Sequence, residues 1–257
     1  MRTKVAPFYF REFHARSATM RQMCELFTGI VLFGAEHLAT LAVIVGTATA
    51  LAVWARRASD ETRNKIAIAL AAALALNKTA AFWTIFAVEH QNWRDGLPMH
   101  LCDWSGIAAI IALLWRGQLA YEMAYFWGLG GTLQALLTPD LKFDFPDIRF
   151  LTFFISHGGT LVAVALLTFG MKMRPWPKSL LRILLWSNVY LIAAGTTDWL
   201  LNENYGYLRA KPASASLLDK LGPWPWYIAS LEAVALLSFL VYYSPFFVAD
   251  RVRKFEK

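Results

Sequence analysis

The sequence predicts an all-α integral membrane protein, a helical bundle with about seven transmembrane helices. The chain is 57% hydrophobic and only 17% charged, whereas soluble domains carry about 25% charged residues. Its apolar residues also gather into stretches of about 20, the length that crosses a bilayer as a helix. We expect seven such spans: His37–Trp54, Ile66–Val88, Leu97–Trp115, Leu119–Thr138, Phe150–Gly170, Leu180–Leu201 and Trp226–Tyr243.

The same pattern divides the 257 residues into three parts. Residues 1–36 mix arginine with aromatic side chains, which predicts an amphipathic segment lying in the membrane interface, with a plain surface tail as the alternative. Residues 37–245 form a single transmembrane domain, because no linker long enough to separate two domains interrupts them. Residues 246–257 form a basic tail.

The basic residues predict an orientation. A net charge of +7 in a soluble chain would suggest nucleic-acid binding, but these Lys and Arg lie mostly between spans, where they orient the protein and contact anionic lipids. We therefore expect no nucleic-acid partner. The side holding the C-terminus carries about 13 basic residues against 6 in the opposite loops, although five more precede the first span. This predicts an N-terminus outside and a C-terminus in the cytoplasm.

Polar side chains inside the spans gather near three loops. These loops follow the second, fourth and sixth spans, so they share one membrane face in either orientation. Ionisable groups inside a span cost several kcal/mol and usually mark a function. We expect them to meet in one leaflet, the outer one if the predicted orientation holds. The polar side chains are His100, Cys102, Asp103, His157, Asp198 and Asn202.

Cys102 is the candidate nucleophile, near the start of a helix expected to begin around Pro98. The helix dipole there favours a thiolate, while burial in lipid opposes it. His100 and Cys102, two residues apart, face away from each other, whereas His100 and Asp103, three apart, can pair. The base for Cys102 is therefore predicted to be His157, and a Cys–His pair is a known activated nucleophile.

Other interpretations of these residues remain. His, Cys and Asp are zinc ligands, but His100 and Cys102 point apart, so one helix cannot easily supply both, and we predict no metal and no cofactor. A buried Cys is also often a small hydrophobic residue. The polar groups would then only tie helices together in a structural membrane protein.

The loop between the last two spans, NENYGYLRAKPASASLLDKLGPWPWY, is long enough to suggest a functional role. Arg209 and Lys211 are predicted to hold a phosphate. An aromatic anchor in a solvated loop is the alternative. The predicted substrate-binding residues are Asp198, Asn202, Asn204, Tyr205, Arg209 and Lys211.

Several motifs resemble the YwaF family, the bacterial relatives of the eukaryotic transmembrane protein 164. They are LFGAEHLATLAVI, LPMHLCDWSG, LQALLTPDL with FPDIRFLTFFISHGG, and NYGYLRAKP with SLLDKLGPWPWY, covering Phe33 to Tyr243. The resemblance implies an acyltransferase that moves a fatty acyl chain onto a lyso-ether phospholipid without acyl-CoA. Its Cys and His correspond to Cys102 and His157 here. More distant intramembrane hydrolases use a Thr–His pair instead.

Residues and resemblance together predict a lipid acyltransferase or transacylase of the bacterial plasma membrane. Its partners would be membrane phospholipids and lysophospholipids, and its oligomeric state is not indicated. One alternative is a proton- or metal-coupled transporter that uses His100, Asp103 and His157 as a relay. A second alternative is an intramembrane lipid hydrolase, in which water replaces the acceptor lipid.

Overall fold

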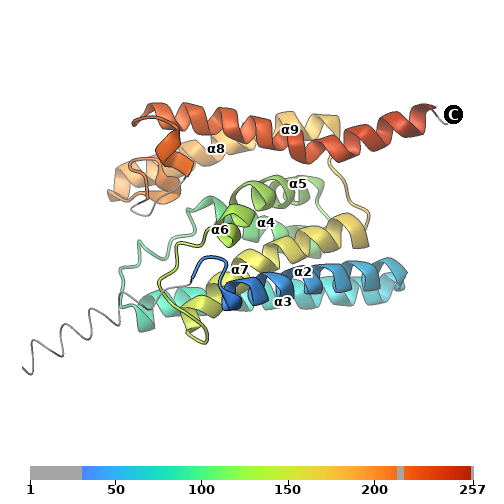
Figure 1. Cartoon of the computed structure of the whole chain (residues 1–257), viewed down its shortest axis with the longest axis horizontal. Coiled ribbons are helices and arrows are strands. Elements are labelled where there is room, and N and C mark those ends of the chain that lie inside the picture. Colours follow the sequence, from blue (N-terminus) through green and yellow to red (C-terminus); the bar gives the residue numbers. More distant parts are fainter. Residues whose placement is uncertain (1–30, 213–216, 256–257) are drawn as a thin grey trace, which may run out of the picture.

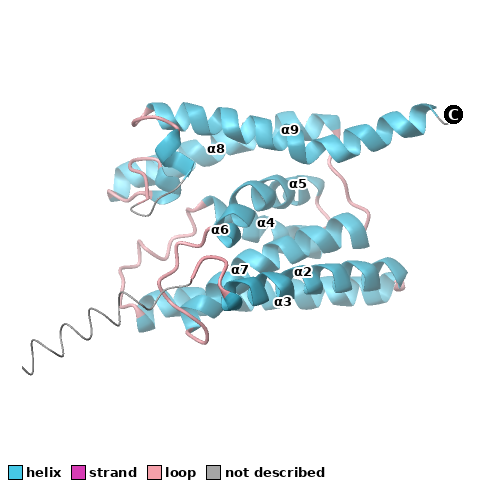
Figure 2. Cartoon of the chain, viewed as in Figure 1, coloured by secondary structure: helices cyan, strands magenta, loops and turns pink. Residues whose placement is uncertain are grey.

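The computed structural model describes residues 31–212 and 217–255, and every regular element within them is a helix (Figure 2). The predicted all-α class is therefore confirmed. Most of the predicted interfacial segment, including Cys24, lies outside the described residues.

Each of the seven predicted stretches coincides with a helical segment, and three of these segments contain a π-helical turn. The elements are α2 (Ala35–Arg57), α3 (Asp60–Trp83) with η1 (Thr84–Val88), α4 (Leu101–Trp115), α5 (Gln118–Trp127) with η2 (Gly128–Thr132) and α6 (Leu133–Leu137), α7 (Ile148–Ala165) with η3 (Leu166–Gly170), α8 (Pro177–Leu201), η4 (Tyr205–Tyr207), η5 (Leu217–Lys220) and α9 (Trp226–Phe255).

Five of the described helical segments are long and apolar enough to cross a membrane, so the chain is an integral membrane protein. The count of seven spans stays a prediction. Helix α4 has only 15 residues, about 22 Å against a hydrocarbon core of about 30 Å, and the segment formed by α5, η2 and α6 is not among the five. The predicted C-terminal tail begins inside α9, which continues to Phe255. The five segments are Ala35–Arg57, Asp60–Val88, Ile148–Gly170, Pro177–Leu201 and Trp226–Val252.

The helices form three layers (Figure 1). Helices α2, α3 and α7 pack together on one side, α4 to α6 lie in the middle, and α8 and α9 run side by side across the top of the view. The upper pair is tied to the middle layer by polar contacts: Trp127 Nε1 donates to Ser187 Oγ at 2.9 Å, and the Tyr125 hydroxyl donates to the carbonyl of Tyr242 at 2.9 Å.

Helix α7 packs closely against α2 and α3 because two glycines leave room for their side chains. A Cβ atom at Gly158 would lie 2.5 Å from Ile44 of α2, and one at Gly159 would overlap Leu74 of α3.

Before helix α7, Asp147 caps the first turn by accepting from the amide of Arg149 at 2.8 Å. The Arg149 guanidinium also donates to both carboxylate oxygens, and these hydrogen bonds lower the pKa of Asp147 to about 2.

His37, which stands in the first of the recognised motifs, is a structural residue. It is fully buried, its Nδ1 accepts from the amide of Phe33 at 3.0 Å, and its Nε2 lies 2.7 Å from the carbonyl of Leu136. Since Nδ1 is an acceptor, Nε2 carries the proton and donates to that carbonyl. The ring thereby fastens the start of α2 to the end of α6.

Helix α4 begins at Leu101, four residues later than the predicted start at Leu97. Pro98 therefore lies outside the helix. The physical reason is the cap: His100 takes the extended N-cap conformation, and its amide donates to Asp103 Oδ2 at 3.2 Å. Cys102 becomes the second residue of the helix, at its positive end.

Candidate functional site

An ion pair lies inside the bundle, between the middle layer and α3. The Lys78 ammonium of α3 donates to Asp103 Oδ1 of α4. The side chains are 28% and 24% exposed, so the pair is partly accessible rather than sealed in a core. Lys78 stands ten residues before Val88, where the segment ends, which is about 15 Å along the helix axis.

Lys78 was not among the predicted site residues. The sequence does carry a signal for it, because a single ammonium stands in the Ala-rich run LAAALALNKTAAF, within a predicted span. A charged side chain at that depth is costly unless it is paired. Its partner could not be identified from the sequence, since Asp103 is 25 residues away on another helix.

The predicted contact between His100 and Asp103 is present, but it is made by the backbone. The amide of His100 donates to Asp103 Oδ2, while the other carboxylate oxygen, Oδ1, accepts from the Lys78 ammonium. The imidazole turns away toward the last loop, where its Nδ1 accepts from the amide of Gly206 at 3.4 Å. Its ring meets Tyr205 edge-on, with 5.7 Å between the ring centres.

A backbone hydrogen bond fixes the tautomer of His157 in α7. Its Nδ1 lies 2.8 Å from the carbonyl of Phe153, and its ring is tilted by 32° against the ring of Phe153, with 4.2 Å between centres. A carbonyl oxygen only accepts, so Nδ1 carries the proton and Nε2 of the neutral ring keeps its lone pair. The backbone of α7 thus fixes both the ring orientation and its basic nitrogen.

Cys102 and His157 lie on helices that pack against each other. The helices α3, α4 and α7 contact one another pairwise. These helices meet at Gly106, where a Cβ atom would lie 3.6 Å from Thr160 Oγ1 of α7 and 3.9 Å from Lys78 Cε of α3. Among the described residues, no hydrogen bond joins the Cys102 thiol to His157 directly.

We call Lys78, His100, Cys102, Asp103 and His157 the polar cluster. Together they supply a thiol at a helix N-terminus, a base, an ammonium and a carboxylate. In residues 31–212 and 217–255, no three His, Cys, Asp or Glu side chains come together as a metal site would require. A thiol and an imidazole are groups that can act as nucleophile and base.

The predicted substrate-binding residues mostly shape the loop between α8 and α9. Asp198 Oδ1 accepts from the amide of Tyr205 at 2.6 Å, and the Asn204 side chain accepts from the amides of Arg209 and Ala210. The Arg209 guanidinium donates to Asn202 Oδ1 at 2.9 Å. These contacts border a polar hollow of about 400 Å³, lined by Asn202, Glu203, Asn204, Arg209 and Ala210.

Lys211 differs from Arg209 in this loop. Its ammonium lies 5.5 Å from the centre of the Tyr227 ring, a cation–π contact. The Arg209 guanidinium instead donates from Nη1 to Asn202 and to two backbone carbonyls.

This loop and helix α8 are both fastened to the segment that precedes α4. The Tyr205 hydroxyl of the loop donates to the carbonyl of Arg94 at 2.5 Å, and the Tyr190 hydroxyl of α8 donates to the carbonyl of Met99 at 3.2 Å. Together with the contact between Gly206 and His100, these bonds cover the start of α4. The loop therefore borders the polar cluster beside Cys102.

Gly206 is required for this attachment. Its φ is +61°, which favours glycine, and a Cβ atom there would overlap the Tyr190 hydroxyl. Gly206→Ala is expected to lower the free energy of unfolding by about 1–3 kcal/mol, measured as thermal unfolding in detergent.

The matched control for Gly206→Ala is Gly195→Ala, in α8 beside the same loop. A Cβ atom at Gly195 would make an ordinary 3.8 Å contact with Leu208, and alanine is the better helix former. Gly195→Ala should therefore leave stability unchanged or raise it. Equal effects of the two substitutions would contradict the assigned role of Gly206.

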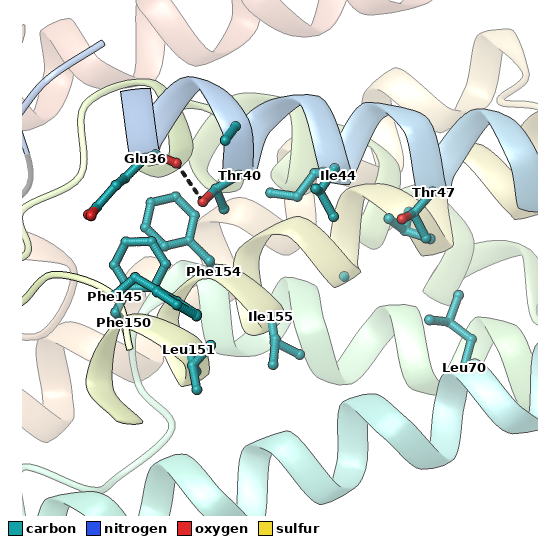
Figure 3. A pocket seen from close by; sticks show the side chains of 14 residues that line it. Glu36, Thr40, Ile44, Thr47, Leu70, Phe145, Phe150, Leu151, Phe154 and Ile155 are labelled. Carbon is teal, nitrogen blue, oxygen red and sulfur yellow. Dashed lines mark hydrogen bonds between the residues drawn. The ribbon is translucent and has the colours of Figure 1, made fainter. Parts of the chain in front are cut away.

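An apolar groove lies elsewhere, between α2 and α7, with a volume of about 490 Å³ (Figure 3). Ile155 and Gly159 of α7 line it, and each is two residues from His157. Residues two apart on a helix point in nearly opposite directions. The groove is therefore on the other side of α7 from the polar cluster.

Comparisons with known proteins agree with the motifs. The sequence signature of the TMEM164 family matches residues 32–243. An uncharacterized protein of Treponema pallidum (strain Nichols) is 26% identical over 159 residues, which cover 62% of this chain and 66%, just under two thirds, of that protein. No solved structure matches the chain significantly. The narrower YwaF name stays a resemblance, while the family signature spans most of the chain and all of the polar cluster. The chain therefore belongs to the TMEM164 family.

Proposed function

We propose that the protein is a phospholipid acyltransferase or transacylase that works through a Cys102 thioester. One observation carries the proposal: a cysteine at a helix N-terminus and a histidine whose Nδ1 donates to a backbone carbonyl belong to one ion-paired cluster inside an integral membrane protein. Charged groups inside a membrane-spanning segment are unfavourable unless they serve a purpose.

In the proposed first half-reaction, His157 Nε2 takes the proton from the Cys102 thiol. The thiolate attacks the carbonyl carbon of a donor phospholipid ester, so that a C–S bond forms and the ester C–O bond breaks. The departing oxygen takes the proton from His157 and leaves as a lysophospholipid. The acyl chain remains on Cys102 as a thioester.

In the second half-reaction, His157 takes the proton from the hydroxyl of an acceptor lysophospholipid. The resulting oxygen nucleophile attacks the thioester, the C–S bond breaks, and the released thiolate recovers the proton from His157. No acyl-CoA and no cofactor are consumed. If water took the place of the acceptor hydroxyl, the same residues would act as a lipid hydrolase.

The proposed headgroup site and the proposed membrane leaflet follow from where the loop residues and the polar cluster lie in the chain. Lys211 would hold the phosphate of a headgroup, with Arg209, Asn202 and Asn204 shaping the hollow beside it. With the N-terminus outside and the C-terminus in the cytoplasm, the polar cluster would open to the outer leaflet of a bacterial plasma membrane.

The test uses purified protein reconstituted into phosphatidylcholine vesicles that contain a phospholipid labelled in its acyl chain and an unlabelled lysophospholipid. An acyltransferase moves the label onto the lysophospholipid, whereas a hydrolase releases it as free fatty acid. Retention of all label on the donor, across donors of different headgroup, would contradict both reactions.

A further inference from the structure

We infer that Lys78 is a positioning residue whose charge, balancing that of Asp103, keeps the Cys102 thiolate accessible inside the membrane. The inference deepens the proposed function, because it concerns the nucleophile of that reaction. It starts from an ammonium that is paired inside an apolar segment and lies among the helices that carry Cys102 and His157.

The charge that Lys78 balances is that of the Asp103 carboxylate. It directly follows Cys102 and lies in the first turn of α4, where its Oδ2 caps the helix by accepting from the amide of His100. A carboxylate at this position suits the helix dipole, but its negative charge disfavours a second negative charge on the neighbouring sulfur. Capping alone would therefore hinder the formation of the thiolate.

Lys78 offsets this effect of the Asp103 charge, because its ammonium pairs with the other carboxylate oxygen, Oδ1. Once His157 has taken the thiol proton, the four groups carry two positive charges, on Lys78 and His157, and two negative charges, on Asp103 and Cys102. Without Lys78 the cluster would carry a net negative charge, in surroundings that screen it poorly.

The surrounding helices hold Lys78 in place. Its neighbour Asn77 donates from Nδ2 to the carbonyl of Thr152 in α7 at 3.1 Å, which sets how α3 lies against α7. The alkyl stem of Lys78 passes close to Gly106 of α4, where a Cβ atom would be in contact with it. These contacts hold the Lys78 ammonium beside Asp103 Oδ1.

Other titratable groups also face this region. They are His100 at the start of α4, His157 on α7, Tyr190 on α8 and Tyr207 in the loop that follows α8. The phenols of Tyr190 and Tyr207 carry no charge near neutral pH, so the fixed charges beside the thiol are those of Lys78 and Asp103.

The test is the pH dependence of Cys102 alkylation by N-ethylmaleimide, followed by mass spectrometry of the full-length protein in detergent. All variants carry Cys24→Ser, so that Cys102 is the remaining thiol. The thiolate is the reactive form. Lys78→Met should raise the pH midpoint of alkylation by at least about one unit, which is about a tenfold slower reaction at a pH below both midpoints. Lys78→Arg should stay near the wild-type midpoint.

Asp103→Asn provides the second arm, since asparagine can still accept from the amide of His100. It should lower the midpoint, and Lys78→Met combined with Asp103→Asn should return toward the wild-type value. A structural role for Lys78 would change the unfolding temperature and leave the midpoint unmoved. The inference is overturned if Lys78→Met matches wild type, or, where that variant does not fold, if Asp103→Asn does.

Alkylation requires no lipid substrate, so this result is separate from the proposed function. A shifted midpoint without any acyl-enzyme would support the role of Lys78 and count against acyl transfer. An acyl-enzyme with an unmoved midpoint would support acyl transfer and count against the role of Lys78.

Discussion

Cys102→Ala is expected to abolish acyl transfer, with a fall of at least about a thousandfold in the vesicle assay. The reason is that the proposed reaction has no route to the acceptor without the thioester, and removal of a nucleophile typically costs several powers of ten. The side chain is small and only partly buried, so the unfolding temperature should change little. The loss would then reflect chemistry and not folding.

The control for this substitution is Cys24→Ser, which removes the other cysteine of the chain. It should leave acyl transfer unchanged. Full activity in Cys102→Ala would remove the nucleophile from the account, and a loss in Cys24→Ser would mean that the wrong cysteine was assigned.

His157→Gln is expected to lower acyl transfer by about a hundredfold or more, the usual contribution of a general base. Glutamine keeps a polar side chain that can still donate to the carbonyl of Phe153, but it cannot take a proton. Lipid binding, measured by co-purifying phospholipid, should be largely retained, because the loop beside the polar cluster is untouched.

The matched control is His90→Gln, since His90 is an exposed residue in the loop that precedes α4. It should retain wild-type activity. If His157→Gln also stayed active, the proton would have to go to another group of the cluster, of which His100 is the nearest in kind.

Much of the fold could be predicted because the membrane imposes a simple length rule. A helix must carry about 20 apolar residues to cross the hydrocarbon core, and each predicted stretch coincides with a helical segment. The start of α4 was misplaced because apolarity continues from Leu97, whereas the helix begins where His100 and Asp103 form the cap. Capping is set by local hydrogen bonds, which hydropathy does not report.

Less of the candidate site could be predicted. Cys102 and His157 stood out as reactive groups near one membrane face, yet the sequence does not say which helices touch. The pairing of Lys78 could not be predicted for that reason, because only the packing of α3 against α4 brings it to Asp103. In the loop after α8, the polar side chains suggested ligand binding, but those of Asn204 and Asp198 hold the loop's own backbone amides.

The most direct test of the central claim is the intact mass of the protein after incubation with phospholipid donors under conditions that preserve thioesters. Wild-type protein should gain the mass of one fatty acyl chain, and neutral hydroxylamine should remove it. Cys102→Ala should gain nothing. An unmodified wild-type protein with every donor, or an adduct of the same mass on Cys102→Ala, would contradict the account.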